Sequence, residues 1–375
     1  MKGRKILMIP GPIEFEPAVM QAVGMQTTSH VAPDFIASFG HALEMMREVW
    51  LAPSGQPFII AGTGTLAMDM AGSNLIEPGD SALVISTGYF GDRYADLLRR
   101  YGANVTLLKA ATGGTIKVSE VEAELKKKRY KLMTFTHVDT STAVMVDPGP
   151  LGLLGQKYGA LTVLDGVCSV AGEEIRQDDW KIDVVLTASQ KAVGVPPGLA
   201  LMVVSEKALG VWRERKTPVG NYYCDWSHWL PVMKAYEERR PSYFGTPAVN
   251  LVTGLEVSLG IILKEGMDSR FARHQYLARG FRAAIRDMGL KMIPLSEEIS
   301  ASTLSAPYYP EGIQGAAFMK AIAASDVILA GGLLPEIKDK YFRVGHMGSV
   351  TNGDILATLS AIDTALKSTG YRSEK

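Results

Sequence analysis

The chain has 375 residues, which is enough for a large buried core and, by the usual size of domains, for two of them. Its 39 Lys and Arg residues equal its 39 Asp and Glu residues, so the formal net charge of zero argues against nucleic acid or an anionic membrane surface as a partner. A hydrophobic content of 47% is ordinary for a folded soluble protein, and no stretch approaches the roughly 18 uninterrupted apolar residues of a membrane span.

The first residues predict an extended arm rather than a packed element. A basic flank is followed by an apolar run that stops at Pro10, which is too short for a secretory leader. Because Pro10, Pro12 and Pro17 favour extended backbone, we assign residues 1–20 to this arm.

Residues 32–51 carry apolar side chains at helical spacing and predict an amphipathic helix. The two cysteines form neither a CxxC pair nor a disulfide framework, so we expect a cytoplasmic protein.

A glycine turn follows the first buried strand, which we expect over residues 57–61. It reads Gly62-Thr-Gly-Thr65 and leads into a helix over residues 66–76. A strand, a glycine turn and a helix start in that order can hold a phosphate, because the backbone N–H groups and the helix dipole both favour an anion. A plain strand-to-helix turn explains the pattern equally well. The same residues match Gly-x-Gly-x-x-Ala, as in nicotinamide or flavin enzymes.

The dinucleotide interpretation lacks its acidic partner. It requires an Asp or Glu at the far end of the next strand, residues 82–85, to hold a ribose hydroxyl. The nearby acid, Asp80, precedes that strand, and Tyr89 and Phe90 follow it. Phe90 is therefore a candidate face for a flat ring to stack on, although an aromatic residue at a strand end more often packs in the core.

Apolar strands then alternate with helices. The expected strands cover residues 105–108, 131–136, 161–165, 184–187 and 199–204, and the expected helices cover residues 92–101, 120–128 and 152–158. This alternation predicts an α/β fold whose mostly parallel sheet has helices on both faces. In such sheets ligands bind at the carboxyl ends of the strands. The residues that fall just past a strand end are Thr65, Phe90, Thr140, Asp165 and Lys191.

Lys191 and Asp165 form the central pair of candidates. Lys191 lies between a buried strand and a Pro-Pro-Gly turn, where burial can lower the pKa of its amine and leave it nucleophilic. A pyridoxal phosphate enzyme needs a lysine for the Schiff base and an acid that keeps the ring nitrogen protonated. Either residue alone is more often a solvated turn lysine or a helix cap. Together with the other strand-end residues, they favour the cofactor interpretation.

The C-terminal part predicts a second, smaller α/β domain over residues 256–375, beside a large domain over residues 21–255. We expect residues 207–250 to be irregular and rich in aromatic side chains. The expected helices cover residues 249–264, 270–288, 315–324 and 352–366. Arg343 lies in a strand otherwise built for burial, so it needs a carboxylate from the protein or from a substrate. The histidines show no metal-ligand spacing, and we expect no metal site.

These segments together resemble the class V aminotransferases of the type I pyridoxal phosphate fold, and most closely the alanine–glyoxylate and serine–pyruvate aminotransferase group. The resemblance covers nearly the whole chain. The motifs that carry it are Pro10-Gly-Pro12, Ala61-Gly-Thr-Gly-Thr65, Glu77-Pro-Gly-Asp80, Gly88-Tyr-Phe-Gly-Asp-Arg93, Thr136-His-Val-Asp-Thr-Ser-Thr142, Asp165-Gly-Val167, Ser189-Gln-Lys191, Pro196-Pro-Gly198, Tyr243-Phe-Gly-Thr-Pro247 and Phe342-Arg-Val-Gly345. The resemblance implies transfer of an amino group from alanine or serine to glyoxylate or pyruvate by a ping-pong mechanism.

The resemblance also implies roles for individual residues. Lys191 would form the Schiff base with pyridoxal phosphate and then shuttle a proton between the substrate Cα and the C4′ atom of the cofactor. Asp165 would pair with the ring nitrogen, Phe90 would stack on the ring, and Thr140 would lie near its polar edge.

Further residues would hold the phosphate and the substrate. The implied phosphate ligands within one subunit are Gly64, Thr65 and Gln190. Tyr243 and Thr246 would reach the phosphate from the other subunit of a homodimer with shared active sites. Arg343 would bind the carboxylate of the amino-acid or oxo-acid substrate, and the arm around Gly11 would line the site.

Two alternatives stay open at this point. A lyase or desulfurase of the same fold would need a mobile loop cysteine to accept sulfur, and the chain offers Cys168 near the ring and Cys224 in the aromatic segment. A nicotinamide-dependent enzyme, or a binding protein without a cofactor, would instead use the Gly62 loop.

Overall fold

A seven-stranded sheet forms the centre of the computed structural model, which describes residues 5–371. Its strands are β2 (Gln56–Ala61), β3 (Ser81–Ser86), β4 (Asn104–Lys109), β5 (Leu132–Thr136), β8 (Leu161–Asp165), β9 (Val184–Ala188) and β10 (Leu199–Val204). They lie in the order β2-β10-β9-β8-β5-β3-β4. Only β10 runs against its neighbours, β2 and β9, while the other pairs are parallel. The expected mostly parallel sheet is confirmed.

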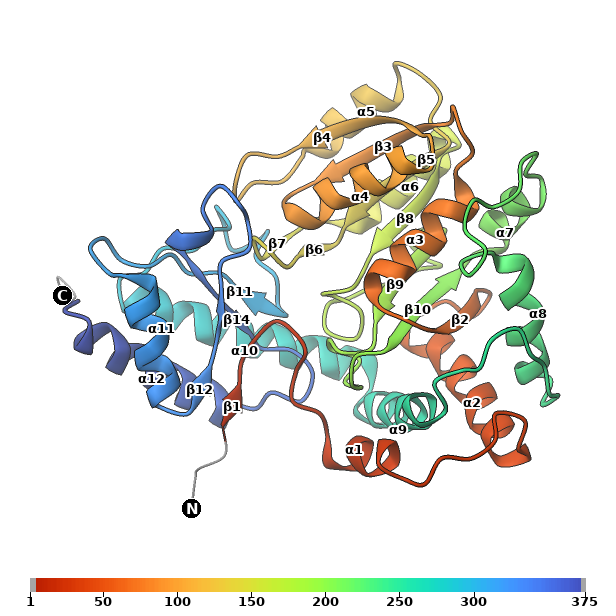
Figure 1. The fold of residues 1–375 in the computed structure, drawn as a ribbon. Helices are drawn as coiled ribbons and strands as arrows, with labels where there is room; N and C mark the ends of the chain where they lie inside the picture. Colours follow the sequence, from red (N-terminus) through yellow and green to blue (C-terminus); the bar gives the residue numbers. More distant parts are fainter. Residues whose placement is uncertain (1–4, 372–375) are drawn as a thin grey trace.

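Helices cover this sheet, as its apolar strands require. Every residue of β5, β8, β9 and β10 is buried, which is possible only where helices pack on both faces. The helices of this part are α2 (Pro33–Val49), α3 (Gly64–Leu75), α4 (Tyr89–Arg100), α5 (Val118–Leu125) and α6 (Pro148–Tyr158). Helices α3 and α4 pack against each other and against the sheet, and α5 packs on α6, which lies against β8 (Figure 1).

The N-terminal segment is tied down at both of its ends. Strand β1 (Ile6–Leu7) pairs in parallel with β12 (Val327–Ile328), more than 300 residues along the chain by these numbers. Helix α1 (Pro17–Val23) packs on α9 (Val249–Glu265). Because proline is well suited to the first position of a helix, the extended arm ends before Pro17, and the prediction of extended backbone through residue 20 is wrong there.

The stretch 207–250, expected to be irregular, contains two helices. Helix α7 (Glu206–Arg213) is capped by Ser205, and helix α8 (Trp226–Glu237) is capped by Asp225, each side chain accepting a hydrogen bond from an amide of the first turn. Pro231 lies inside α8 and hid its helical pattern, since proline normally breaks a helix. Burial of the tryptophans of α8 compensates for this by anchoring the helix in the core.

The C-terminal part has its own small sheet and its own apolar core. The sheet consists of β13 (Ala330–Gly331), β14 (Phe342–Gly345) and β11 (Leu304–Ser305), with β14 in the middle. A separate hairpin, formed by β6 (Val138–Asp139) and β7 (Val144–Met145), belongs to the earlier part of the chain. The helices are α10 (Met267–Asp287), α11 (Gly315–Ala324) and α12 (Asn352–Ser368), with a 3₁₀ turn at Lys338–Lys340. A second cluster of buried residues fills the space between them.

Two further expectations concern the chain as a whole. The expected domain boundary after residue 255 falls inside α9 and stays a prediction. Residues 1–4 of the expected arm and residues 372–375 of the expected small domain lie outside the described part of the chain. Within residues 5–371, no helix is both long enough and apolar enough to cross a membrane.

Candidate active site

A cavity of about 190 Å³ lies at the carboxyl edge of the central sheet. The predicted site residues that line it are Gly11, Gly64, Thr65, Phe90, Thr140, Asp165, Gln190 and Lys191. They come from the N-terminal arm, from loops and helix starts that follow strands, and, for Asp165, from the last residue of β8. Parallel strands bring their carboxyl ends to one edge, and this is why residues so far apart in sequence meet here. Arg343, Tyr243 and Thr246 do not line the cavity.

Lys191 lies in the turn after β9 with only 8% of its surface exposed. Burial lowers the pKa of its amine, and nearby Arg343 lowers it further. The amine donates a hydrogen bond to the carbonyl of Pro10. The next residue, Gly11, has φ +94°, and a Cβ there would collide with the Lys191 side chain. Glycine therefore lets the arm cross directly over the lysine.

Asp165 is the last residue of β8 and is 2% exposed. Its Oδ1 accepts a hydrogen bond from the backbone N–H of Val167 at 3.0 Å. Burial, together with the negative charge of Asp139, raises the pKa of Asp165 to about 6, although Val167 N–H and the charge of Lys191 oppose the shift. Asp165 forms no ion pair with any described residue, so this buried carboxylate can still accept a cationic group inside the cavity.

Asp139 was not among the predicted site residues, yet it organises one wall of the cavity. Its Oδ2 accepts a hydrogen bond from the backbone N–H of Phe90 at 3.0 Å, in the first turn of α4. Its Oδ1 accepts from the backbone N–H of Ser141 at 2.9 Å and from the Ser141 hydroxyl at 2.6 Å. An acid in a polar segment directly after a buried strand was the sequence signal that could have identified it.

The start of α3 fits a phosphate. The helix begins at Gly64 without a side-chain cap and without an acidic residue in its first turn, so its first N–H groups can bind an anion. A Cβ on Gly64 would lie 2.7 Å from Cγ2 of Val167, which keeps this position small. Arg93, which was not among the predicted site residues, donates to the Thr65 hydroxyl at 3.0 Å and brings a positive charge to the same end.

The cavity as a whole fits pyridoxal phosphate. It combines an anion-binding helix start, an aromatic side chain, a buried carboxylate and a buried lysine in one small space. The hydroxyl of Thr136 also lines it, is buried and has no hydrogen-bond partner among the described residues, so it is free to bond to a polar ligand.

Arg343 lies on β14 beside the cavity. Its Nε donates to the carbonyl of Gly331 at 2.8 Å, and its Nη1 donates to the carbonyl of Thr140, a cavity residue, at 3.2 Å. It forms no ion pair with any described residue, so the protein carboxylate that the sequence left open does not appear within residues 5–371. Its guanidinium can therefore bind the carboxylate of a substrate.

The remaining candidates lie away from the cavity or are unsuited to the alternatives. Tyr243 is 65% exposed and Thr246 is also exposed, so their roles across a subunit interface stay predictions. Cys224 is buried, which raises its pKa to about 12, and burial also raises the pKa of Cys168. Neither is the exposed loop thiolate that a desulfurase needs. Within residues 5–371, no three His, Cys, Asp or Glu side chains gather to hold a metal ion.

Comparison with known proteins agrees with this geometry. The family model described as Aminotransferase class-V matches residues 18–334. Alanine–glyoxylate aminotransferase 1 of Saccharomyces cerevisiae is 36% identical over 361 residues, which cover 92% of this chain and 93% of the yeast protein. Serine–glyoxylate aminotransferase of Arabidopsis thaliana is 30% identical, over 98% of this chain and 92% of the plant protein.

The fold agrees as well. The crystal structure of an alanine–glyoxylate aminotransferase from Nostoc sp. superposes with a TM-score of 0.91 at 30% identity, covering 98% of this chain and 96% of that one. Neither the cavity nor these relatives favour a desulfurase or a nicotinamide enzyme. The resemblance found in the sequence is confirmed: the chain belongs to the class V aminotransferases and is a pyridoxal phosphate-dependent aminotransferase.

Proposed function

We propose that the enzyme transfers the amino group of alanine or serine to glyoxylate or pyruvate, in two half-reactions that use the same site in turn. The observation that carries this proposal is the cavity of about 190 Å³, which is lined by a buried lysine and a buried carboxylate. Beside it lies Arg343, which has no ion-pair partner within residues 5–371 and bonds to the cavity residue Thr140. The names of all three relatives include glyoxylate, while two name alanine and one names serine as the amino donor, which supports glyoxylate as the acceptor.

Besides Lys191, which would form the Schiff base, and Thr140, which would lie near the polar edge of the ring, five residues would hold the cofactor within one subunit. Pyridoxal phosphate, when bound, supplies an electron-withdrawing ring that stabilises the negative charge left at the substrate Cα. The carboxylate of Asp165 would hold the proton of the ring nitrogen, and its pKa of about 6 leaves it mostly ionised at neutral pH. Phe90 would cover one ring face. The residues that would hold the phosphate are Gly64, Thr65 and Gln190.

Lys191 and Arg343 act on the substrate in this proposal. Because burial lowers the pKa of Lys191, its amine can be neutral and take the proton that leaves the substrate Cα. Arg343 binds the substrate carboxylate and so fixes which Cα–H bond faces that amine. The arm at Pro10 and Gly11 covers the lysine and keeps water away from it.

We propose that two subunits share each site, with Tyr243 and Thr246 of one subunit near the phosphate of the other. The exposure of both residues supports this. A mixing experiment tests it. Lys191→Ala protein and Tyr243→Ala/Thr246→Ala protein are each inactive or weak, but a mixed dimer contains one intact site. Recovery of activity on subunit exchange supports shared sites, and no recovery despite exchange contradicts them.

A cytoplasmic location is also part of the proposal. Both cysteines are free and buried, which suits a reducing compartment. Cell fractionation with an antibody against the protein tests it, and recovery in a secreted or membrane fraction would contradict it.

The donor and acceptor are tested by half-reaction. The purified enzyme is mixed with alanine, serine, aspartate or cysteine, and the loss of the visible cofactor band is followed; glyoxylate and pyruvate are then compared for its return. We expect alanine or serine to be fastest. Lys191→Ala should lose both turnover and the lysine-linked band. Release of sulfide from cysteine by the wild-type enzyme would instead favour a desulfurase.

A further inference from the structure

A buried arginine on α10 connects the two catalytic segments of the chain. Arg270 is 5% exposed, and its guanidinium reaches three separate acceptors. Its Nη2 donates to the carbonyl of Ala192 at 2.8 Å, and its Nε donates to the carbonyl of Ala171 at 2.7 Å. Ala192 directly follows Lys191, and Ala171 lies on the segment that continues from Asp165. One side chain therefore bridges the backbone beyond both catalytic residues.

The hydrogen bonds of Arg270 hold backbone that lies beyond the end of the β8–β9 strand pairing. The pairing of β8 with β9 ends at Asp165 and Leu186, so Lys191 lies beyond the last ladder contact between these strands. The turn that carries it is held locally by the N–H of Gly194, which donates to the carbonyl of Lys191 at 2.8 Å. Thr187 Oγ1 donates to the carbonyl of Gly166 at 3.0 Å near the strand ends. Arg270, from another element, is the side chain that joins the Lys191 turn itself to the segment after Asp165.

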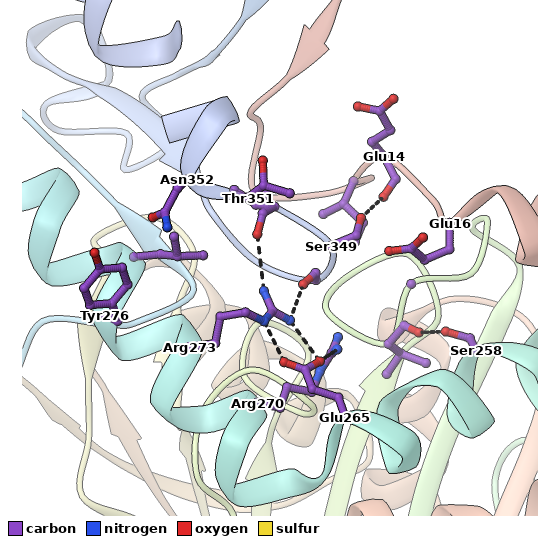
Figure 2. A pocket seen from close by; sticks show the side chains of 16 residues that line it. Glu14, Glu16, Ser258, Glu265, Arg270, Arg273, Tyr276, Ser349, Thr351 and Asn352 are labelled. Carbon is purple, nitrogen blue, oxygen red and sulfur yellow. Dashed lines mark hydrogen bonds and ion pairs between the residues drawn. The ribbon is translucent and has the colours of Figure 1, made fainter. Parts of the chain in front are cut away.

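The guanidinium is itself held by a shared glutamate. Nη1 of Arg270 donates to Oε2 of Glu265 at 2.7 Å, and Nε of Arg273 donates to Oε1 of the same carboxylate at 2.6 Å (Figure 2). Arg273 also donates to the carbonyls of Gly348 at 2.9 Å and Val350 at 3.2 Å, in the loop after the strand of Arg343. The glutamate thus joins two arginines that hold different loops.

A lysine could not replace Arg270 in this arrangement. Three acceptors lie in different directions around one planar group, and a guanidinium presents fixed donors to all of them, whereas an ammonium is a point charge on a flexible stem. Figure 2 shows the side chains of Glu265, Arg270 and Arg273 meeting. All three line a cavity of about 440 Å³, which Val193 and Gly194 of the lysine turn also line.

We propose that Arg270 is a positioning residue for the transamination: it fixes the Lys191 turn relative to the Asp165 segment and to the C-terminal part of the chain. The proposal rests on the roles proposed above for Lys191 and Asp165, but it does not depend on which donor or acceptor the enzyme uses. Arg273 provides the matched control, since it lies on the same helix and shares Glu265, but its hydrogen bonds go to the carbonyls of Gly348 and Val350 and not to the lysine turn.

Hydrogen–deuterium exchange of the cofactor-free protein tests the proposal without relying on activity. Arg270→Lys should raise exchange of the Gly194 and Val195 amides by about tenfold or more, the effect of losing a charged hydrogen bond. Arg273→Lys should leave these amides as in the wild type and raise exchange near residues 348–352. The proposal would be overturned if the Gly194 amide of Arg270→Lys exchanged at the wild-type rate. It would also be overturned if both variants raised exchange equally in the lysine turn and in residues 348–352.

Two further measurements separate positioning from general support. In the cofactor-loaded enzyme, Arg270→Lys should lower kcat by about tenfold or more with little change in KM, because substrate binding through Arg343 is untouched. If Arg270→Lys does not fold, Glu265→Gln replaces it: the guanidinium keeps its carbonyl acceptors but loses its charged anchor. Faster exchange at Gly194 in Glu265→Gln supports the proposal, and unchanged exchange contradicts it.

Discussion

The backbone N–H of Phe90 donates to the carboxylate of Asp139 over 3.0 Å, so an acid on the β6 hairpin sets the position of the aromatic side chain that faces the cavity. Asp139→Ala removes the acceptor for this N–H and for Ser141. We expect cofactor affinity to fall by about 10- to 100-fold, since hydrogen bonds to a buried charged group contribute about 1.5–3 kcal/mol. Fluorescence titration of the cofactor-free protein measures this.

The control for that prediction is Asp92→Ala. Asp92 lies in the same first turn of α4 but accepts hydrogen bonds from Ser86 and Lys109 rather than from Phe90. It should change affinity by less than about threefold. Equal losses in the two variants would mean that the helix start, and not Phe90, matters.

Gly11→Ala should inactivate the enzyme, and Gly79→Ala should not. Both glycines have nearly the same φ, +94° and +92°, so the backbone strain of alanine should cost each about 1 kcal/mol of folding free energy. A Cβ at Gly11 meets the Lys191 side chain, whereas nothing lies within 4 Å of one at Gly79. Thermal unfolding should show similar small losses, while the visible cofactor band should weaken only in Gly11→Ala. A normal band in that variant would contradict the close approach of arm and lysine.

Asp165→Asn should stabilise the cofactor-free protein at high pH. Burial raises the pKa of this carboxyl group from 3.8 to about 6, so the native state holds a proton that the unfolded state has lost between these values. The native protein therefore loses stability as the pH rises through about 6, by up to about 3 kcal/mol, and the asparagine variant does not. Urea unfolding should give equal stabilities near pH 3.5 and a gain for the variant at about pH 8. A variant that is less stable at high pH would contradict the shift.

Arg343→Gln should weaken the binding of acids specifically. Without the guanidinium, KM for alanine and for glyoxylate should each rise by about 10- to 100-fold, the effect of losing a charged hydrogen-bond pair. Ethylamine, which lacks the carboxylate, should bleach the cofactor band at the same slow rate in both proteins. A parallel loss with ethylamine would assign Arg343 to the architecture of the Thr140 loop, to which it also bonds.

The sequence predicted the positions of side chains that lie at or just past the end of a strand. It did not predict contacts between residues far apart in the chain. Asp165 and Lys191 could be placed because continuous apolar runs mark buried strands, whose carboxyl ends share an edge. Asp139 and Phe90, which form a hydrogen bond, are 49 residues apart, and Arg270 and Ala171 are 99 residues apart. Contacts over such distances leave no periodic pattern in the sequence. Helix α8 was missed because Pro231 outweighed the capping signal of Asp225.

The pairing of β1 with β12 also orders events during synthesis. The segment that passes over the catalytic amine leaves the ribosome before its docking partner, Val327–Ile328, which follows it by more than 300 residues. A nascent chain can build its central sheet long before it can close the lysine pocket. A chain that stopped before residue 327 would lack the strand that docks β1, and with it the support for the arm whose Pro10 carbonyl accepts the hydrogen bond of Lys191.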